Sequence, residues 1–231
     1  IMKWYLGDSV EAYKALGKEN TDWQKEIYQL GKSIDGNVAL SGKVGGSRMF
    51  YMPFRVSLGY HNQDGTLKTS SFKRETLALN LTPTLFDEHL VINLNGKGMN
   101  MDNRFANQEA IGNAVKMDPT QPVYDNSVNG LNGYFWWNNG KGTPTIDNAN
   151  TLAISNPVAL LNDKKDISNA KRFIGNAQFD YKIHGFEDLH LNLNLGIDYS
   201  KSDGTVDIAP GTEQSFHAKQ QSGSGSHTDY N

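Results

Sequence analysis

Four consecutive aromatic residues form the group of side chains best suited to bind a ligand. The run Tyr134, Phe135, Trp136 and Trp137 is flanked by polar side chains, namely Asn132, Asn138, Asn139 and Lys141. Flat rings stack on the apolar faces of sugars, and amides pair with hydroxyl groups. We therefore expect the run to be a platform that contacts a sugar or a peptide. The alternative is that the rings pack the segment onto itself or onto a partner.

The sequence has no group of residues typical of an enzyme. It contains no cysteine, which excludes thiol catalysis and disulfide bonds. Gly140-Lys141-Gly142-Thr143 lacks the first glycine of a phosphate-binding loop. The histidines lack the spacing of a metal site and stand at 61, 89, 184, 190, 217 and 227. We therefore predict that the protein is not an enzyme and holds no metal and no cofactor.

The composition excludes two further classes of function. The 231 residues carry a formal net charge of -3, and no basic cluster suggests a nucleic-acid partner. No apolar run approaches the roughly 18 residues that a transmembrane helix needs. A mean hydropathy of -0.58 suggests a soluble protein at first sight. However, the wall of a transmembrane β-barrel alternates apolar and polar residues, so its average hydropathy also looks soluble.

Residues 189–199 show the clearest structural pattern. Leucines at 189, 191, 193 and 195 alternate with polar residues, and Ile197 and Tyr199 continue the apolar series. A period of two indicates a β-strand with one apolar and one polar face. At about 3.3 Å per residue the strand is about 36 Å long, so a tilt of about 45° leaves about 25 Å of height. That height matches the lipid-facing band of an outer-membrane barrel.

The same alternation predicts six strands, and the connections between them alternate between short and long. Short turns on one side and long loops on the other match the periplasmic and extracellular ends of an outer-membrane barrel. The polar faces would then line the interior, and we select Arg55, Asn93, Asn192 and Asp198 as lumen-facing residues. The predicted strands are 34–43, 54–61, 72–82, 89–98, 172–183 and 189–199.

These patterns predict an all-β fold: an antiparallel transmembrane β-barrel segment of about six strands from a larger barrel, with long extracellular loops and a short helical N-terminal part. Thr21 and Gln24 form a capping box, and Trp23, Ile27 and Leu30 share one helical face before Gly31. A second helix is expected at 107–117. We divide the chain into a helical extracellular segment (1–32), four barrel strands (33–99), a long extracellular loop (100–171), a barrel hairpin (172–200) and a truncated extracellular loop (201–231).

One alternative comes from a different class of protein. A soluble or surface β-sandwich that binds glycans, such as an adhesin module, explains the loops rich in asparagine, glycine and aromatic residues equally well. It does not explain strands of ten or eleven residues with a fully apolar face. A sandwich would stay monomeric in plain buffer, whereas a barrel segment would need detergent.

Seven stretches resemble the SusC/RagA group of TonB-dependent transporters from Bacteroidetes. Together they run in a consistent order from about residue 20 to 200. They are residues 20–27 (NTDWQKEI), 37–42 (NVALSG), 54–65 (FRVSLGYHNQDG), 104–106 (RFA), 117–122 (MDPTQP), 156–161 (NPVALL) and 172–176 (RFIGN).

The resemblance implies more than the patterns do. The fold of this family is a twenty-two-stranded barrel filled by a plug. The resemblance implies an outer-membrane importer of glycan or peptide cargo that works under a SusD-like surface lipoprotein and receives energy through the TonB complex. The chain looks like the second to seventh strands, so we expect it to be a segment of a longer protein.

Overall fold

The computed structural model describes residues 16–47, 49–127, 131–137, 150, 152–217 and 225–230. Eight strands form one antiparallel sheet in the order β1-β2-β3-β5-β6-β7-β8, with the short β4 pairing with β2 and β5. The strands are β1 (Ser33–Ser47), β2 (Phe50–Asp64), β3 (Ser71–Leu81), β4 (Thr84–Leu85), β5 (Leu90–Phe105), β6 (Lys164–Ile183), β7 (Phe186–Ile208) and β8 (Ser226–Tyr230).

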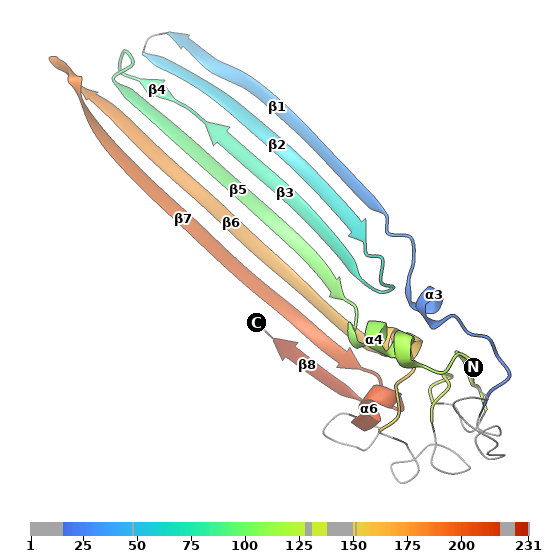
Figure 1. The fold of residues 1–231 in the computed structure, drawn as a ribbon. Coiled ribbons are helices and arrows are strands. Elements are labelled where there is room, and N and C mark those ends of the chain that lie inside the picture. The colour runs from blue at the N-terminus through green and yellow to red at the C-terminus, as the bar shows by residue number, and fades with distance from the viewer. Residues whose placement is uncertain are drawn as a thin grey trace.

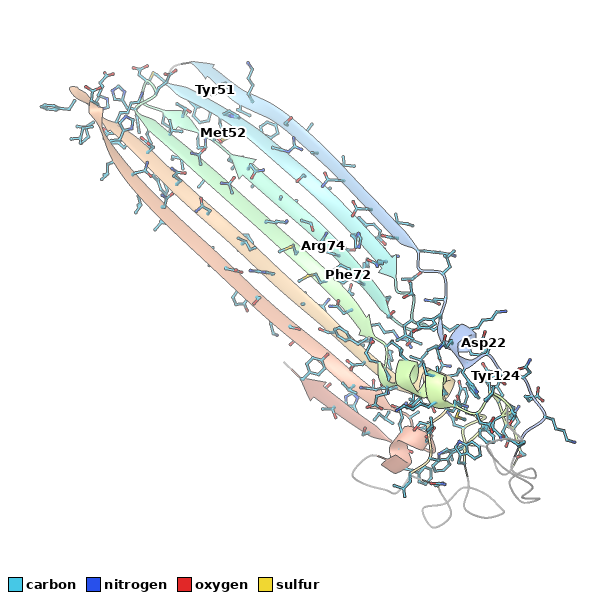
Figure 2. All side chains as sticks on the ribbon, viewed as in Figure 1. Asp22, Tyr51, Met52, Phe72, Arg74 and Tyr124 are labelled. Carbon is cyan, nitrogen blue, oxygen red and sulfur yellow. The ribbon has the colours of Figure 1, made fainter. Side chains whose placement is uncertain are left out.

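The sheet is a single layer. Its strands run side by side, and no second sheet covers either face in the described part of the chain (Figure 1). Side chains project from both faces along the whole length of the strands (Figure 2). The leucines of β7 that a sandwich would bury are exposed, with Leu191 at 65% and Leu195 at 54%. The sandwich interpretation is therefore wrong, and the predicted barrel-wall fold is confirmed.

The short turns and the long loops lie at opposite ends of the sheet, as predicted. The turns that join β1 to β2, β4 to β5 and β6 to β7 share one end, and the helices gather at the other (Figure 1). The β6–β7 turn is the dipeptide His184-Gly185, in which Gly185 adopts a φ of 83° that glycine tolerates without strain.

Most strands extend beyond the predicted ends. β5 continues to Phe105 instead of ending at 98, β6 begins at Lys164 instead of 172, and β7 runs to Ile208 instead of 199. The predicted ends lie where apolar alternation fades. Backbone pairing does not require an apolar face, so the ladder continues after the side chains become polar. β8 lies within the predicted loop 201–231 and escapes prediction for the same reason, because its sequence SHTDY has no apolar alternation.

The buried core lies outside the sheet, at its helical end. We call this part the loop domain, made of the described residues within 16–32, 65–70, 106–163 and 209–217. Its helices are α3 (Trp23–Ile27), α4 (Glu109–Lys116), α5 (Pro157–Asn162) and α6 (Glu213–His217). The main cluster of buried apolar residues is Trp23, Ile27, Leu67, Ala106, Ala110, Ala114, Met117, Val158, Leu160 and Leu161.

The N-terminal helix differs from its prediction. Asp22, not Thr21, caps α3, because its carboxylate accepts a hydrogen bond from the Lys25 amide. Thr21 instead donates its hydroxyl proton to the Gln121 carbonyl at 2.7 Å. The helix ends at Ile27, and Leu30 is exposed beyond it. The helix expected at 107–117 is α4, shorter by two residues at its start and one at its end.

Candidate functional site

The register of the sheet places the four selected polar residues on one face. Residues opposite each other in an antiparallel pair share a face, and so do residues two apart in one strand. Asn93 lies two residues before Asn95 in β5. Asn192 lies four residues before Gly196 in β7, and Asp198 lies two residues after it. Arg55 begins the row of cross-strand partners that joins these positions: Arg55, Asn80, Asn95, Asn176 and Gly196, from β2 to β7. We call this face the inner face.

The opposite, outer face carries an apolar band that the described chain leaves uncovered. On β7 the band runs from Leu191 to Tyr199, a rise of about 27 Å along the strand. Beyond Tyr199 the outer face becomes polar, where Lys171 and Lys201 lie opposite each other. An exposed apolar face of this size, limited by polar residues, marks a surface that contacts lipid or another protein.

Acidic side chains on the inner face of β6 and β7 are engaged by neighbours. The Arg172 guanidinium donates to both oxygens of Asp198, at 2.9 and 2.5 Å. Asn192 donates its amide proton to Asp180 at 3.0 Å, and a His190 ring nitrogen lies 2.6 Å from the same carboxylate. Within the described residues, Arg55 and Asn93 make no side-chain hydrogen bond or ion pair.

The aromatic run packs within the loop domain. Trp136 is 3% exposed and contacts Leu131 and Phe216, a residue of α6. Tyr134, Phe135 and Trp137 are partly buried against the main core cluster. Phe135 and Trp137 meet edge to face, with ring centroids 5.1 Å apart. Asn138, Asn139 and Lys141 lie outside the described residues.

Asn156 organises the loop domain, and sequence reasoning did not single it out. Its side-chain oxygen caps α5 by accepting from the Val158 and Ala159 amides. Its side-chain amide donates to the Val123 and Phe135 carbonyls, which ties the aromatic run to the helix. The signal present in the sequence is Asn156-Pro157, because asparagine at the cap and proline at the first helical position are typical of a helix start.

Two carboxylates are buried in the loop domain, and one of them, Glu213, joins the loop that contains α6 to the loop that contains Asn156. Glu213 of α6 is 3% exposed and accepts a hydrogen bond from the Asn156 backbone amide at 3.2 Å. Asp163 is 6% exposed and accepts from the Asn132 side chain at 2.9 Å. Burial raises the pKa of Glu213 to about 7 and that of Asp163 to about 6. Sequence reasoning missed both, because burial of a carboxylate has no local sequence signal.

Five of the histidines, at 61, 89, 184, 190 and 227, make pairwise contacts. His89 and His184, from neighbouring short turns, stack with ring centroids 3.8 Å apart. His61 lies 2.9 Å from Asp35, and His227 pairs with Asp207. Within the described residues, no three histidine, aspartate or glutamate side chains are arranged to hold a metal ion. In the same residues, no helix has the length and hydropathy to cross a membrane.

A single sheet with one apolar and one polar face, and helices at one end only, is the wall of a transmembrane β-barrel. The fold agrees with a solved structure, the RagAB peptide importer in its closed-closed state. The TM-score is 0.60 at 19% identity, over 84% of this chain and 20% of that one. At this identity the likeness shows the fold. No family model matches the chain.

Curated relatives give the sequence evidence for the class. The chain is 38% identical over 213 residues to the TonB-dependent receptor SusC of Bacteroides thetaiotaomicron, covering 88% of this chain and 20% of the receptor. It is 30% identical over 175 residues to the TonB-dependent receptor P3 of Formosa agariphila, covering 74% of this chain and 16% of that receptor.

The chain is SusC-like over nearly its whole length and corresponds to a segment of the barrel of a TonB-dependent receptor. It spans about a fifth of the length of these relatives. The predicted resemblance and the outer-membrane location are confirmed by the same comparisons. The relatives are receptors and importers by name, not enzymes.

Proposed function

We propose that this chain forms part of the wall and extracellular rim of a TonB-dependent outer-membrane importer of glycans or peptides. The observation that carries the proposal is the uncovered apolar band of the outer face. A monomeric soluble domain rarely exposes a patch of this size, whereas lipid requires one. The likeness to the SusC receptor and to a peptide importer supports the transport role.

In this proposal the inner face lines the lumen. Arg55, Asn93, Asn192 and Asp198 would contact water or cargo, because polar side chains face the interior of a large barrel. Residues 33–99 and 172–200 would cross the membrane. The segments 1–32, 100–171 and 201–231 would lie on the extracellular side, and the polar ends of β5, β6 and β7 would stand above the lipid.

The loop domain provides the surface for partners. In this proposal a SusD-like surface lipoprotein and the glycan or peptide cargo both contact the loop domain. Tyr134, Phe135 and Trp137 keep part of their surface exposed and would stack on cargo, whereas the buried Trp136 would anchor the run in the loop domain through Leu131 and Phe216. The TonB complex would contact parts of the relatives that this chain does not match. Outer-membrane lipid covers the outer face.

Growth on single nutrients tests the transport role. A strain that lacks the natural full-length protein would be grown on neutral oligosaccharides, acidic oligosaccharides or peptides as the only carbon source. We expect growth to fail on one of these classes and to return with the wild-type gene. Complementation in a strain without TonB should not restore growth. Unchanged growth on every class would contradict the proposal.

A further inference from the structure

The inner face contains a small polar cavity close to the loop domain. The cavity has a volume of about 170 Å³ and lies across β1, β2, β3 and β5. Gly59 forms part of its floor: a Cβ there would lie 3.5 Å from both the Asn37 amide nitrogen and the Thr76 Cβ. Because glycine has no side chain, the space between these two polar residues stays open. Arg74 and Lys97 also line the cavity, and Figure 2 labels Arg74 on β3.

The cavity has an excess of positive charge. Within the described residues, Arg74 and Lys97 form no ion pair. Of the acids that the structure describes, Asp35 alone lines the cavity, and His61 engages it at 2.9 Å. Two permanent cations therefore face the cavity against one carboxylate that already has a partner. Such an arrangement favours an anion, because a charge-assisted hydrogen bond to a carboxylate is stronger than a neutral one.

A third cation extends this charge along the inner face. Lys97 lies opposite Ala78 and Arg55 lies opposite Asn80, so the three cations stand at the levels of residues 74, 78 and 80 of β3. The spacings along β3 are about 13 and 7 Å. Arg55 also forms no ion pair within the described residues. A single anion would need only the cavity with Arg74 and Lys97, whereas a ligand with several anionic groups would also use Arg55.

The position of the cavity along the strands places it near the extracellular mouth of the proposed barrel. On the outer face of β3, Leu77 is the last apolar residue and Glu75 is the first charged one. Arg74 and Thr76 stand at this level on the inner face. A ligand that enters from the side of the loop domain would therefore meet Arg74 and Thr76 before it reaches Lys97, which stands at the level of the apolar band.

We propose that this cavity binds a carboxylate group of an acidic oligosaccharide, with Arg74 and Lys97 as its cationic contacts. The inference rests on the proposed function and specifies the cargo class. An oligosaccharide is favoured over an acidic peptide because amide and hydroxyl groups accompany the cations. Asn37 and Thr76 line the cavity, and Asn80 and Asn95 stand beside Arg55 in the row below. These groups pair with sugar hydroxyls.

Binding to the natural full-length protein in detergent tests the proposal. The probes are trigalacturonate, neutral maltotriose and triglutamate, measured by calorimetry. We expect Arg74→Gln and Lys97→Gln each to weaken trigalacturonate binding about tenfold and to reduce its salt dependence. Arg74→Lys should retain most of the affinity. The matched control is Lys171→Gln, which removes a cation at the same level on the outer face and should change nothing.

The outcomes separate the failure of the site from the failure of the barrel wall. Equal binding of trigalacturonate by wild type and both glutamine variants overturns the inference, and so does equally tight binding of maltotriose. Tighter binding of triglutamate would make the site a peptide site and overturn the oligosaccharide assignment. If Lys171→Gln weakens binding as much as Arg74→Gln, the assignment of the two faces fails, and with it the proposed barrel wall. A heat-modifiable gel mobility confirms that each variant is folded, and Lys97→Gln suffices if Arg74 variants do not fold.

Discussion

The sheet and the loop domain are held together in opposite ways. The sheet has long backbone ladders, such as the twenty residues of β6 against β7, but buries none of its large side chains. The loop domain has helices of five to eight residues but contains all the buried apolar residues of the described chain. The sheet therefore depends on lipid and neighbouring strands for its apolar contacts, whereas the loop domain supplies its own core.

This difference predicts where the truncation of an apolar side chain reduces stability most. Leu161 of α5 is 1% exposed in the core of the loop domain. Leu161→Ala should destabilise that domain by about 2–5 kcal/mol, because it leaves a cavity that cannot fully collapse. Limited proteolysis of the full-length protein would measure the effect as faster cleavage of the loop domain with an intact barrel. Leu152→Ala is the control, since Leu152 is 97% exposed and should show no change.

A charge on the outer face tests the sheet in the same way. Leu195 lies within the apolar band and is flanked in β7 by Asn194 on the inner face. Leu195→Arg should reduce the free energy of unfolding in lipid vesicles by about 2–4 kcal/mol, because the guanidinium enters the hydrocarbon. Asn194→Arg should change it by less than about 1 kcal/mol. Similar losses for both variants would show that the two faces have the same environment.

Acidity should affect the loop domain through Glu213. Its pKa is raised from the ordinary value of 4.5 to about 7, so the docked α6 binds its proton more tightly than the free segment does. Docking of α6 is therefore strongest below pH 4.5 and weakens as the pH rises through 7, by on the order of 3 kcal/mol.

Hydrogen exchange of the α6 amides at about pH 5 and pH 8, corrected for intrinsic rates, would measure this change. Glu213→Gln should remove most of the pH dependence, because an amide does not ionise and Asp163 is the one of the two buried acids that still titrates in this range. Glu109→Gln, which alters an exposed acid of α4, should leave it intact. Equal protection at both pH values in the wild type would contradict the burial of an ionisable Glu213.

The two regions also differ in how far the sequence predicts them. The faces of the strands are predictable because side-chain alternation is local: Leu195 and Asn194 are assigned by their neighbours alone. The strand ends are not, because pairing continues where alternation fades. The helix α4 could be predicted, but the packing of the loop domain could not, since it depends on contacts between distant residues. Trp23 donates to the Asp118 carbonyl across 95 positions, and Asn156 donates to Glu213 across 57.

The candidate site also has one part that local alternation predicts and one part that depends on contacts between distant residues. Alternation placed Arg55, Asn93, Asn192 and Asp198 on one face, as the register shows. It did not reveal that Arg74 and Lys97 share a cavity, because their strands are brought together by pairing between β3 and β5. The role of Asn156 was also hidden, although its motif was visible, because its partners Val123 and Phe135 are remote in sequence.

The central claim is that the outer face of the sheet contacts lipid and the inner face contacts water. The accessibility of spin labels along β7 tests it most directly. The chain contains no cysteine, so single cysteines at 191–198 of the full-length protein can carry a nitroxide label with no competing site from this chain. We predict that labels at odd positions are relaxed by lipid-soluble oxygen, and labels at even positions by a water-soluble nickel complex, with a period of two. Uniform exposure of all positions to the nickel complex would contradict the assignment of the outer face to lipid.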